Sequence, residues 1–156
     1  MKKSLLGLFG FVFSLHVFAC EKGETEIISC SLPGKVLRDV SFCQDNKSKE
    51  IKYHFSKSNK IELSLLFNGN NKLKRLVDTS IGVTYVGFRR GGYGYTVNIM
   101  NGEESNEYSM SFDVKRNDKV IQSDDCLTSY YSDEIDSKYI ENISFKSGAG
   151  NDFVFP

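Results

Sequence analysis

The sequence predicts an all-β fold, either a single antiparallel sandwich or a small up-and-down barrel of about eight strands. Apolar and polar residues alternate over short segments, and turn-forming residues separate these segments at short intervals. No internal repeat or low-complexity linker interrupts the pattern. Short strands joined by tight turns are typical of antiparallel sandwiches and barrels.

Residues 1–19 have the composition of a signal peptide. Two lysines follow Met1, and an apolar run then extends from Leu5 to Phe18, which is shorter than the roughly 20 residues that a membrane span needs. We therefore expect export to the periplasm. The small residue before Cys20 also suits a lipoprotein site, but an even set of four cysteines in the remaining chain favours a soluble product over a lipid anchor at Cys20.

Residues 20–126 are expected to form a disulfide-stabilised β domain. Its alternating segments lie at 25–31, 35–43, 51–55, 61–67, 83–85, 93–99, 108–114 and from 120 toward 126. The turns between them include Pro33-Gly34, Lys57 to Lys60, Asn101-Gly102 and Arg116 to Lys119. A longer connection at 68–80 is expected to be a loop or a short helical turn. Residues 127–156 are expected to form a short irregular or helical C-terminal extension.

The four cysteines are expected to form two disulfides. A two-residue turn at Pro33-Gly34 would place Cys43 opposite residue 24 and on the same face as Cys30, and those two cysteines would be too far apart along the ladder to bond. We therefore predict the pairs Cys20 with Cys43 and Cys30 with Cys126. This is one of the three connectivities that four cysteines allow.

Composition and residue types argue against several classes of function. The 20 basic and 20 acidic residues balance to a formal charge of zero, so nucleic acid is not an expected partner. His54 is the one histidine after the signal peptide, it lies on a predicted strand, and no motif for a nucleophile, a metal or a phosphate is present. We predict no enzyme activity, no catalytic residues, no metal and no cofactor.

The stretch from Gly87 to Tyr95, GFRRGGYGY, is the candidate site for binding a protein partner. Its predicted contact residues are Arg89, Arg90, Gly91, Gly92, Tyr93 and Tyr95. Arginine can bind a carboxylate through paired hydrogen bonds, and arginine and tyrosine often dominate binding energy at interfaces. The alternative is an ordinary hairpin, in which glycines at 91 and 92 supply positive φ, the tyrosines fill the core and the arginines keep the tip soluble.

Three motifs in this order resemble a group of small exported bacterial β proteins. They are CSLPGKVLRDVSFC, YHFSKSNKIELSL and GFRRGGYGYTVNI, followed by an asparagine-glycine turn and a closing cysteine, over about residues 28 to 126. The group itself implies no activity. The stretch from Arg89 to Tyr95 is also similar to the inhibitory loop of periplasmic lysozyme inhibitors, although here the arginines precede the glycines. Periplasmic toxin immunity proteins share the same size and compartment.

These resemblances imply a periplasmic protein-binding module, an inhibitor or immunity protein against a cell-wall-degrading enzyme or toxin. The expected partner is a lysozyme-like hydrolase or a secreted toxin. Catalytic carboxylates line the groove of an enzyme that cleaves glycans, so an arginine-bearing hairpin could block such a groove. The alternative is a small-ligand-binding or envelope structural β protein with no inhibitory role.

Overall fold

The computed structural model describes residues 20–104, 107–132, 135, 137–144 and 155–156. The predicted signal peptide, 1–19, lies outside these residues. The described part contains eleven strands: β1 (Glu24–Leu32), β2 (Arg38–Asp45), β3 (Ile51–Lys57), β4 (Lys60–Phe67), β5 (Leu73–Asp78), β6 (Val83–Arg90), β7 (Tyr93–Asn101), β8 (Tyr108–Arg116), β9 (Lys119–Asp125), β10 (Thr128–Tyr131) and β11 (Ile140–Ile143). No described helix is long and apolar enough to cross a membrane.

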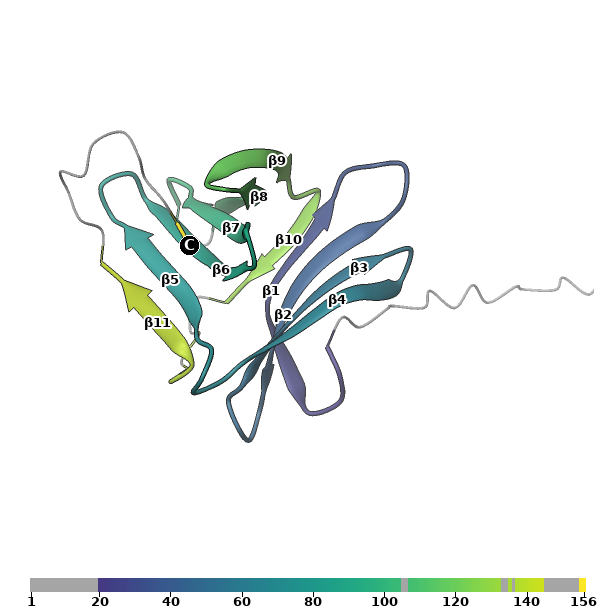
Figure 1. Cartoon of the computed structure of the whole chain (residues 1–156). Coiled ribbons are helices and arrows are strands. Elements are labelled where there is room, and N and C mark those ends of the chain that lie inside the picture. Colours follow the sequence, from purple (N-terminus) through teal and green to yellow (C-terminus); the bar gives the residue numbers. More distant parts are fainter. Residues whose placement is uncertain (1–19, 105–106, 133–134, 136, 145–154) are drawn as a thin grey trace, which may run out of the picture.

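The strands form two sheets that pack face to face as a sandwich (Figure 1). The first sheet has the order β10-β1-β2-β3-β4, and the second has the order β11-β5-β6-β7-β8-β9. All paired strands are antiparallel except β11 and β5, which are parallel. The chain changes sheets three times, between β4 and β5, between β9 and β10 and between β10 and β11. The predicted all-β class and its sandwich alternative are confirmed, and the sheets do not close into a barrel.

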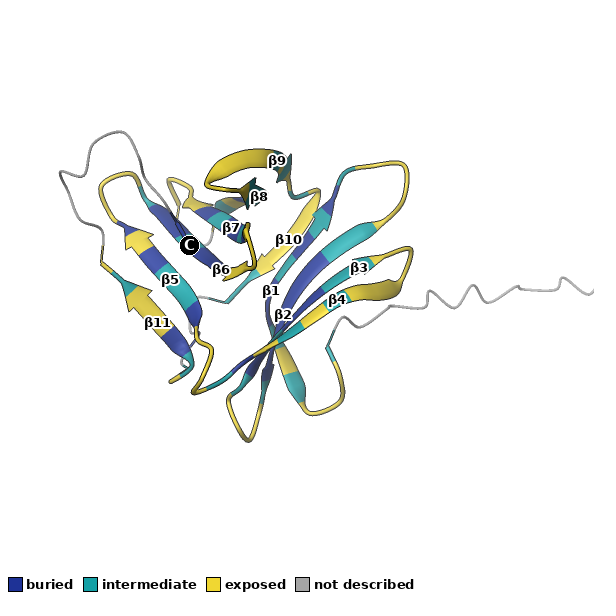
Figure 2. Ribbon diagram, in the orientation of Figure 1, coloured by how far each residue is buried: buried dark blue, intermediate teal, exposed yellow. Residues whose placement is uncertain are grey.

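Figure 2 shows the buried residues in dark blue on the strands of both sheets. The core that they form is rich in aromatic rings. Tyr53 on β3 is fully buried at its centre, with ring centroids 5.1 Å from Phe42 and 4.7 Å from Phe88. Phe88 also packs on Phe67 and stacks on Tyr95. Side chains alternate between the inner face of each sheet, which meets the other sheet, and the outer face, as the period of a strand requires.

Both predicted disulfides are confirmed: Cys20 bonds Cys43, and Cys30 bonds Cys126. The predicted register was wrong. Leu32 pairs with Arg38, so the β1–β2 connection is longer than a two-residue turn, and a β-bulge after Glu26 places Cys43 opposite Glu26. Cys30 therefore lies on the inner face and Cys43 on the outer face of the first sheet.

Two tight hairpins follow from residues that tolerate positive φ. Ser58 and Asn59 join β3 to β4 with φ of 50° and 62°, and Asn117 and Asp118 join β8 to β9 with φ of 50° and 65°. Two consecutive residues at positive φ define a type I′ turn, whose twist matches that of the flanking strands. The predicted turns at 57–60 and 116–119 are therefore present.

The C-terminal extension contributes strands to both sheets, which corrects the expectation of an irregular or helical segment. Strand β10 pairs with β1 and β11 pairs with β5, while Ile135 and Ile140 belong to the core. The connection at 68–80 contains strand β5 rather than a helical turn. The connection at the expected Asn101-Gly102 turn is longer than two residues, because β7 ends at Asn101 and β8 begins only at Tyr108.

Candidate functional site

The predicted partner-binding stretch forms the β6–β7 hairpin. Gly91 has a φ of 60° and Gly92 is not at positive φ, which is the pattern of a type II′ turn with glycine first. The expectation of positive φ is therefore confirmed for Gly91 and wrong for Gly92. The neighbouring β8–β9 turn supports this tip, because the N–H of Asn117 donates to the carbonyl of Gly92 at 3.1 Å.

The hairpin sends its two arginines to opposite faces of the second sheet. Phe88 points into the core, so Arg89 points to the outer face and Arg90 to the inner face. Tyr93 pairs with Arg90 and shares its face. The six predicted contact residues are thus not one surface.

Arg89 is already engaged within the molecule. Its Nη2 pairs with the carboxylate of Asp118 on the β8–β9 turn, and its Nε donates to the carbonyl oxygen of Pro156. Its side chain is 39 % exposed, so one edge of the guanidinium still meets solvent. These contacts favour a structural role for Arg89 over partner contact.

Tyr95 also faces inward, where it belongs mainly to the core. Its ring stacks on Phe88 with centroids 5.0 Å apart and planes at 18°, and it is only half-buried because it lies near the open end of the sandwich. Tyr93, two residues closer to the tip, is 36 % exposed. Tyr93 is therefore the tyrosine that a partner could reach.

One row of side chains crosses four strands on the inner face of the second sheet, beside the β6–β7 and β8–β9 turns. Arg90 pairs with Tyr93, Tyr93 with Arg116, and Arg116 with Lys119. We call these four residues the Arg90 row. All four are exposed, and the guanidinium carbon of Arg116 lies 5.7 Å from the centroid of the Tyr93 ring, within the range of a cation–π contact.

The three cations of the Arg90 row have no carboxylate partner in the described part of the chain. Adjacent strands lie about 4.8 Å apart, so the backbones of Arg90 and Lys119 are separated by roughly 14 Å. Three uncompensated positive charges around an exposed aromatic ring produce a local positive potential on a chain with no net charge.

Sequence reasoning found Arg90 and Tyr93 but missed Arg116 and Lys119. Those two residues flank the Asn117-Asp118 turn, so they pair with each other. Counting pairs outward from this turn and from Gly91-Gly92 would have given two pairs, but only the register of β7 and β8, which pairs Tyr93 with Arg116, joins them in one row.

His54 lies on the outer face of the first sheet and is 6 % exposed. Both of its ring nitrogens are buried without a hydrogen-bond partner in the described structure. Burial lowers the pKa of His54, an effect that Lys52 strengthens and that Glu24 and Glu21 partly oppose.

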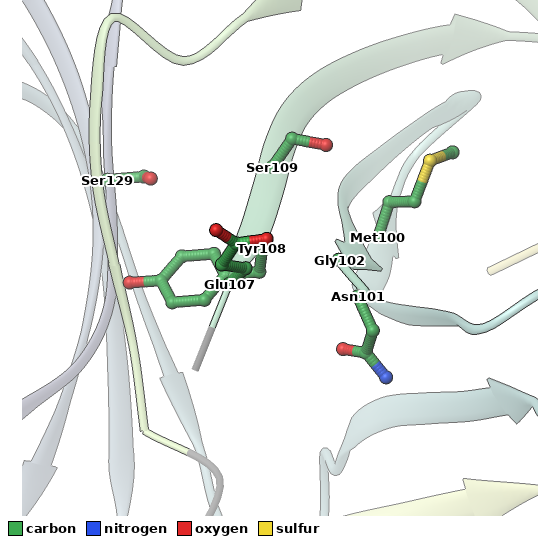
Figure 3. Close-up of a pocket in the computed structure, with 7 residues that line it drawn as sticks. All are labelled: Met100, Asn101, Gly102, Glu107, Tyr108, Ser109 and Ser129. Atoms are coloured by element: carbon green, nitrogen blue, oxygen red, sulfur yellow. The ribbon is translucent and has the colours of Figure 1, made fainter. Parts of the chain in front are cut away.

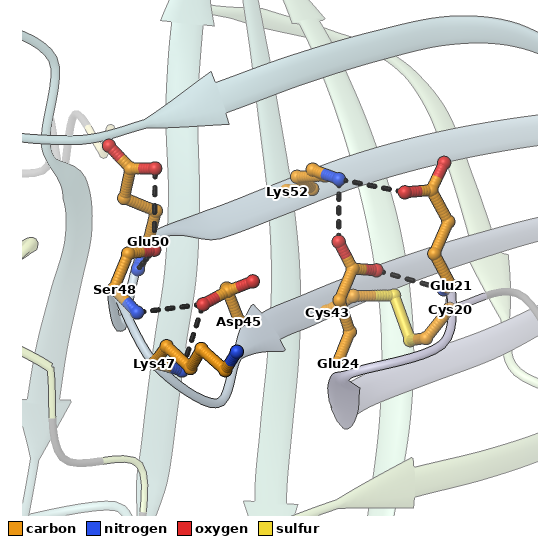
Figure 4. Close-up of polar contacts among 9 residues, drawn as sticks. All are labelled: Cys20, Glu21, Glu24, Cys43, Asp45, Lys47, Ser48, Glu50 and Lys52. Carbon is orange, nitrogen blue, oxygen red and sulfur yellow. Dashed lines mark hydrogen bonds and ion pairs between the residues drawn. A yellow bond between two sulfur atoms is a disulfide. The ribbon is translucent and has the colours of Figure 1, made fainter.

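A polar cluster surrounds the Cys20–Cys43 disulfide on the same outer face (Figure 4). Lys52 pairs with the carboxylates of Glu24 at 2.6 Å and Glu21 at 3.1 Å. The sulfurs of Cys20 and Cys43 lie close to the carboxylate of Glu24, but both belong to the disulfide and offer no thiolate to a metal.

An open cavity of 680 Å³ lies where β7 and β8 approach β10 (Figure 3). It is lined by Met100, Asn101, Gly102, Glu107, Tyr108, Ser109 and Ser129. The hydroxyl of Tyr108 accepts a hydrogen bond from the backbone N–H of Tyr131 at 3.1 Å, which fixes the ring between the two sheets. Most of the lining residues are polar, with Met100 and Tyr108 as the large apolar side chains, so a ligand bound there would itself be polar.

No family model, no curated protein and no solved structure matches this chain.

Proposed function

We propose that this protein is an exported protein-binding module whose Arg90 row binds an acidic surface of its partner. The observation that carries the proposal is the set of three cations, without a carboxylate partner among the described residues, that line up beside the exposed ring of Tyr93. Charged groups that lack internal partners steer oppositely charged proteins, and arginine and tyrosine supply much of the binding energy once contact is made.

The partner class that we propose is a cell-wall-degrading enzyme or a secreted toxin, so the protein would act as an inhibitor or an immunity protein. Enzymes that cleave glycans carry a pair of carboxylates in an open groove. The Arg90 row, with three cations beside a tyrosine, is complementary to such a groove in charge. Arg90 and Arg116, on either side of Tyr93, would bind the carboxylates.

The proposed compartment is the periplasm. Two disulfides and no free cysteine in the described residues are consistent with an oxidising, exported environment. The sulfur of Cys20 is bonded to Cys43, and lipid attachment as a thioether would need that same sulfur. This supports a soluble product over a lipid-anchored one.

The test uses the purified protein and a panel of glycan-cleaving lysozymes and secreted wall-degrading toxins. Binding is measured by calorimetry, and inhibition by the clearing of a cell-wall suspension. We expect at least one enzyme to bind and to be inhibited, with affinity that falls as salt rises. Arg90→Glu and Arg116→Glu should each weaken binding at least 30-fold, because a hot-spot residue contributes about 2 kcal/mol or more.

The matched control is Lys72→Glu, which makes the same charge change at an exposed residue between β4 and β5. It should leave the affinity within about threefold of the original. The proposal fails if the panel yields no inhibited enzyme, or if the Arg90 and Arg116 variants bind as well as the Lys72 control.

The cavity beside Tyr108 favours a second candidate function, the binding of a small polar ligand. Its lining includes the carboxylate of Glu107 and the amide of Asn101 but no cation. A screen of neutral and amino sugars by nuclear magnetic resonance would show shifts at Tyr108 and Ser129 if this candidate is right. Shifts confined to the Arg90 row would argue against it.

A further inference from the structure

The outer face of the second sheet holds two residues from the far end of the chain. Phe155 and Pro156 lie against β6, β7 and β8, and Figure 1 shows this chain end beside β6. The ring of Phe155 is 2 % exposed, and its centroid is 6.0 Å from that of Tyr85. Phe155 is not part of the core cluster between the sheets. It is therefore buried by a separate site on the outside of the sandwich.

Two cations bind the main-chain oxygens of these residues. Nζ of Lys115 donates to the carbonyl of Phe155 at 2.5 Å, and Nε of Arg89 donates to the carbonyl of Pro156. Arg89 and Lys115 both pair with Gly94, so they stand on either side of it on the same face. Charge-assisted hydrogen bonds of this kind are stronger than those between neutral groups.

Gly94 makes room for the proline ring between the two cations. A Cβ at this position would lie 3.4 Å from Cδ of Pro156, already in van der Waals contact. Any longer side chain there would overlap the proline. The groove formed by Tyr85, Arg89, Gly94 and Lys115 thus has an aromatic wall, an open floor and two hydrogen-bond donors, and we call it the tail groove.

We propose that the tail groove is a binding site for an extended peptide segment carrying an aromatic residue followed by proline, and that Phe155–Pro156 is its displaceable occupant. The groove recognises the ring through Tyr85 and the main-chain oxygens through Arg89 and Lys115. Phe155 and Pro156 lie outside the core cluster and belong to no strand, so neither sheet needs them for its strand pairing. This inference does not depend on the partner proposed for the Arg90 row.

The experiment opens the groove and supplies its occupant from solution. The full-length variant Phe155→Asp expels the tail, because a carboxylate cannot replace a buried ring. The probe is a heptapeptide with the sequence of residues 150–156, GNDFVFP, titrated to millimolar concentration while amide and ring resonances are followed by nuclear magnetic resonance. We expect saturable shifts at Tyr85, Gly94 and Lys115 in the variant.

The unmodified protein should need at least fivefold more peptide for the same shifts. Its own tail competes at an effective concentration on the order of millimolar. Two further variants in the Phe155→Asp background test the proposed contacts. Lys115→Met keeps the apolar stem but removes the donor, and Arg89→Ala removes the other donor. Each should weaken peptide binding at least fivefold.

Two controls make the result specific. Gly94→Val in the Phe155→Asp background fills the groove floor and should abolish binding, whereas Arg90→Ala on the inner face should leave it unchanged. A peptide with alanine in place of Phe155 should not bind. The proposal is overturned if the open variant, with its amide spectrum otherwise preserved, does not bind the peptide, or if the Gly94→Val variant binds it equally well.

Discussion

Arg89 and Arg90 are consecutive in the chain, yet their side chains leave the second sheet on opposite faces. Arg89 contacts Asp118 and Pro156 on the outer face, and Arg90 lines up with Tyr93 on the inner face. Alternation along a strand makes this separation unavoidable. The two residues therefore cannot contribute to one flat contact surface, and their roles can be separated by single substitutions.

Arg89→Ala should lower stability without weakening partner binding. Arg90→Ala should weaken partner binding without lowering stability. Arg89 loses an ion pair with Asp118 and a hydrogen bond to Pro156, both partly exposed, so we expect a loss of about 1 kcal/mol in the free energy of unfolding. Arg90 has no such contacts with the described part of the chain. Urea denaturation measures the first effect and calorimetric titration the second; equal stability of the two variants would contradict the assignment.

Gly87→Ala should be strongly destabilising, although alanine usually suits a strand better than glycine. A Cβ at Gly87 would lie 2.4 Å from the carbonyl oxygen of Tyr95 on the neighbouring strand, and backbone cannot move aside cheaply. We expect a loss of about 2–3 kcal/mol. Gly69→Ala is the matched control, because nothing lies within 4 Å of its Cβ and the change should stay within about 0.5 kcal/mol. Thermal denaturation of both variants checks the difference.

Much of the fold could be predicted because it follows from local pattern. Alternation identified β3, β4, β7 and β8, and turn residues at Ser58-Asn59 and Asn117-Asp118 fixed two hairpins. Strand β5, LKRLVD, escaped because its apolar residues do not alternate. The parallel pairing of β5 with β11 joins segments distant in sequence, and no local signal specifies it.

The candidate site also contains residues that a local pattern identifies and residues that only strand pairing brings in. Arg90 and Tyr93 could be predicted from one glycine-rich stretch, but Arg116 and Lys119 join them only through strand register. The engagement of Arg89 by Pro156 depends on a contact between residues 67 positions apart. Such a contact is set by tertiary packing, so strand alternation could separate Arg89 from Arg90, but the sequence could not show that Arg89 is already engaged.

Tyr53→Phe should leave stability unchanged or raise it by about 1 kcal/mol. The hydroxyl of Tyr53 is buried without a hydrogen-bond partner among the residues that the structure describes, and burial raises its pKa so far that it stays protonated. Removing an unsatisfied polar atom relieves a desolvation cost while the ring contacts with Phe42 and Phe88 remain. Tyr53→Leu, which loses those contacts, should be destabilising by several kcal/mol. A loss of stability in Tyr53→Phe would indicate a partner for the hydroxyl.

Removing the Cys30–Cys126 disulfide should cost more stability than removing Cys20–Cys43. The first bond joins residues 96 apart and the second joins residues 23 apart. A longer closed loop restricts the unfolded chain more, by about 1 kcal/mol for this ratio of lengths. Cys30 also belongs to the core, whereas Cys20 lies at the start of the described chain. Double-alanine variants compared by urea denaturation test the order, and an equal or reversed cost would refute it.

His54 should make the protein less stable as the pH falls below about 6.5. Burial lowers the pKa of His54 in the folded state below its ordinary value of 6.5, so the unfolded chain binds a proton first. Its contribution to stability is therefore complete above pH 6.5 and declines on acidification, by at most about 1.4 kcal/mol per pH unit.

The variant His54→Thr should flatten the dependence of unfolding free energy on pH between 7.5 and 5.0, measured by urea denaturation. Glu24 provides the control in a lower range. Burial opposes its ionisation, but hydrogen bonds from Lys52 and from the backbone of Glu21 lower its pKa overall, so its contribution is present above pH 4.5 and declines as the pH falls further. Glu24→Gln should not flatten the slope between 7.5 and 5.0, because the Glu24 carboxylate raises the pKa of His54 and its removal lowers that pKa further. An unchanged slope in His54→Thr would mean that another group titrates there.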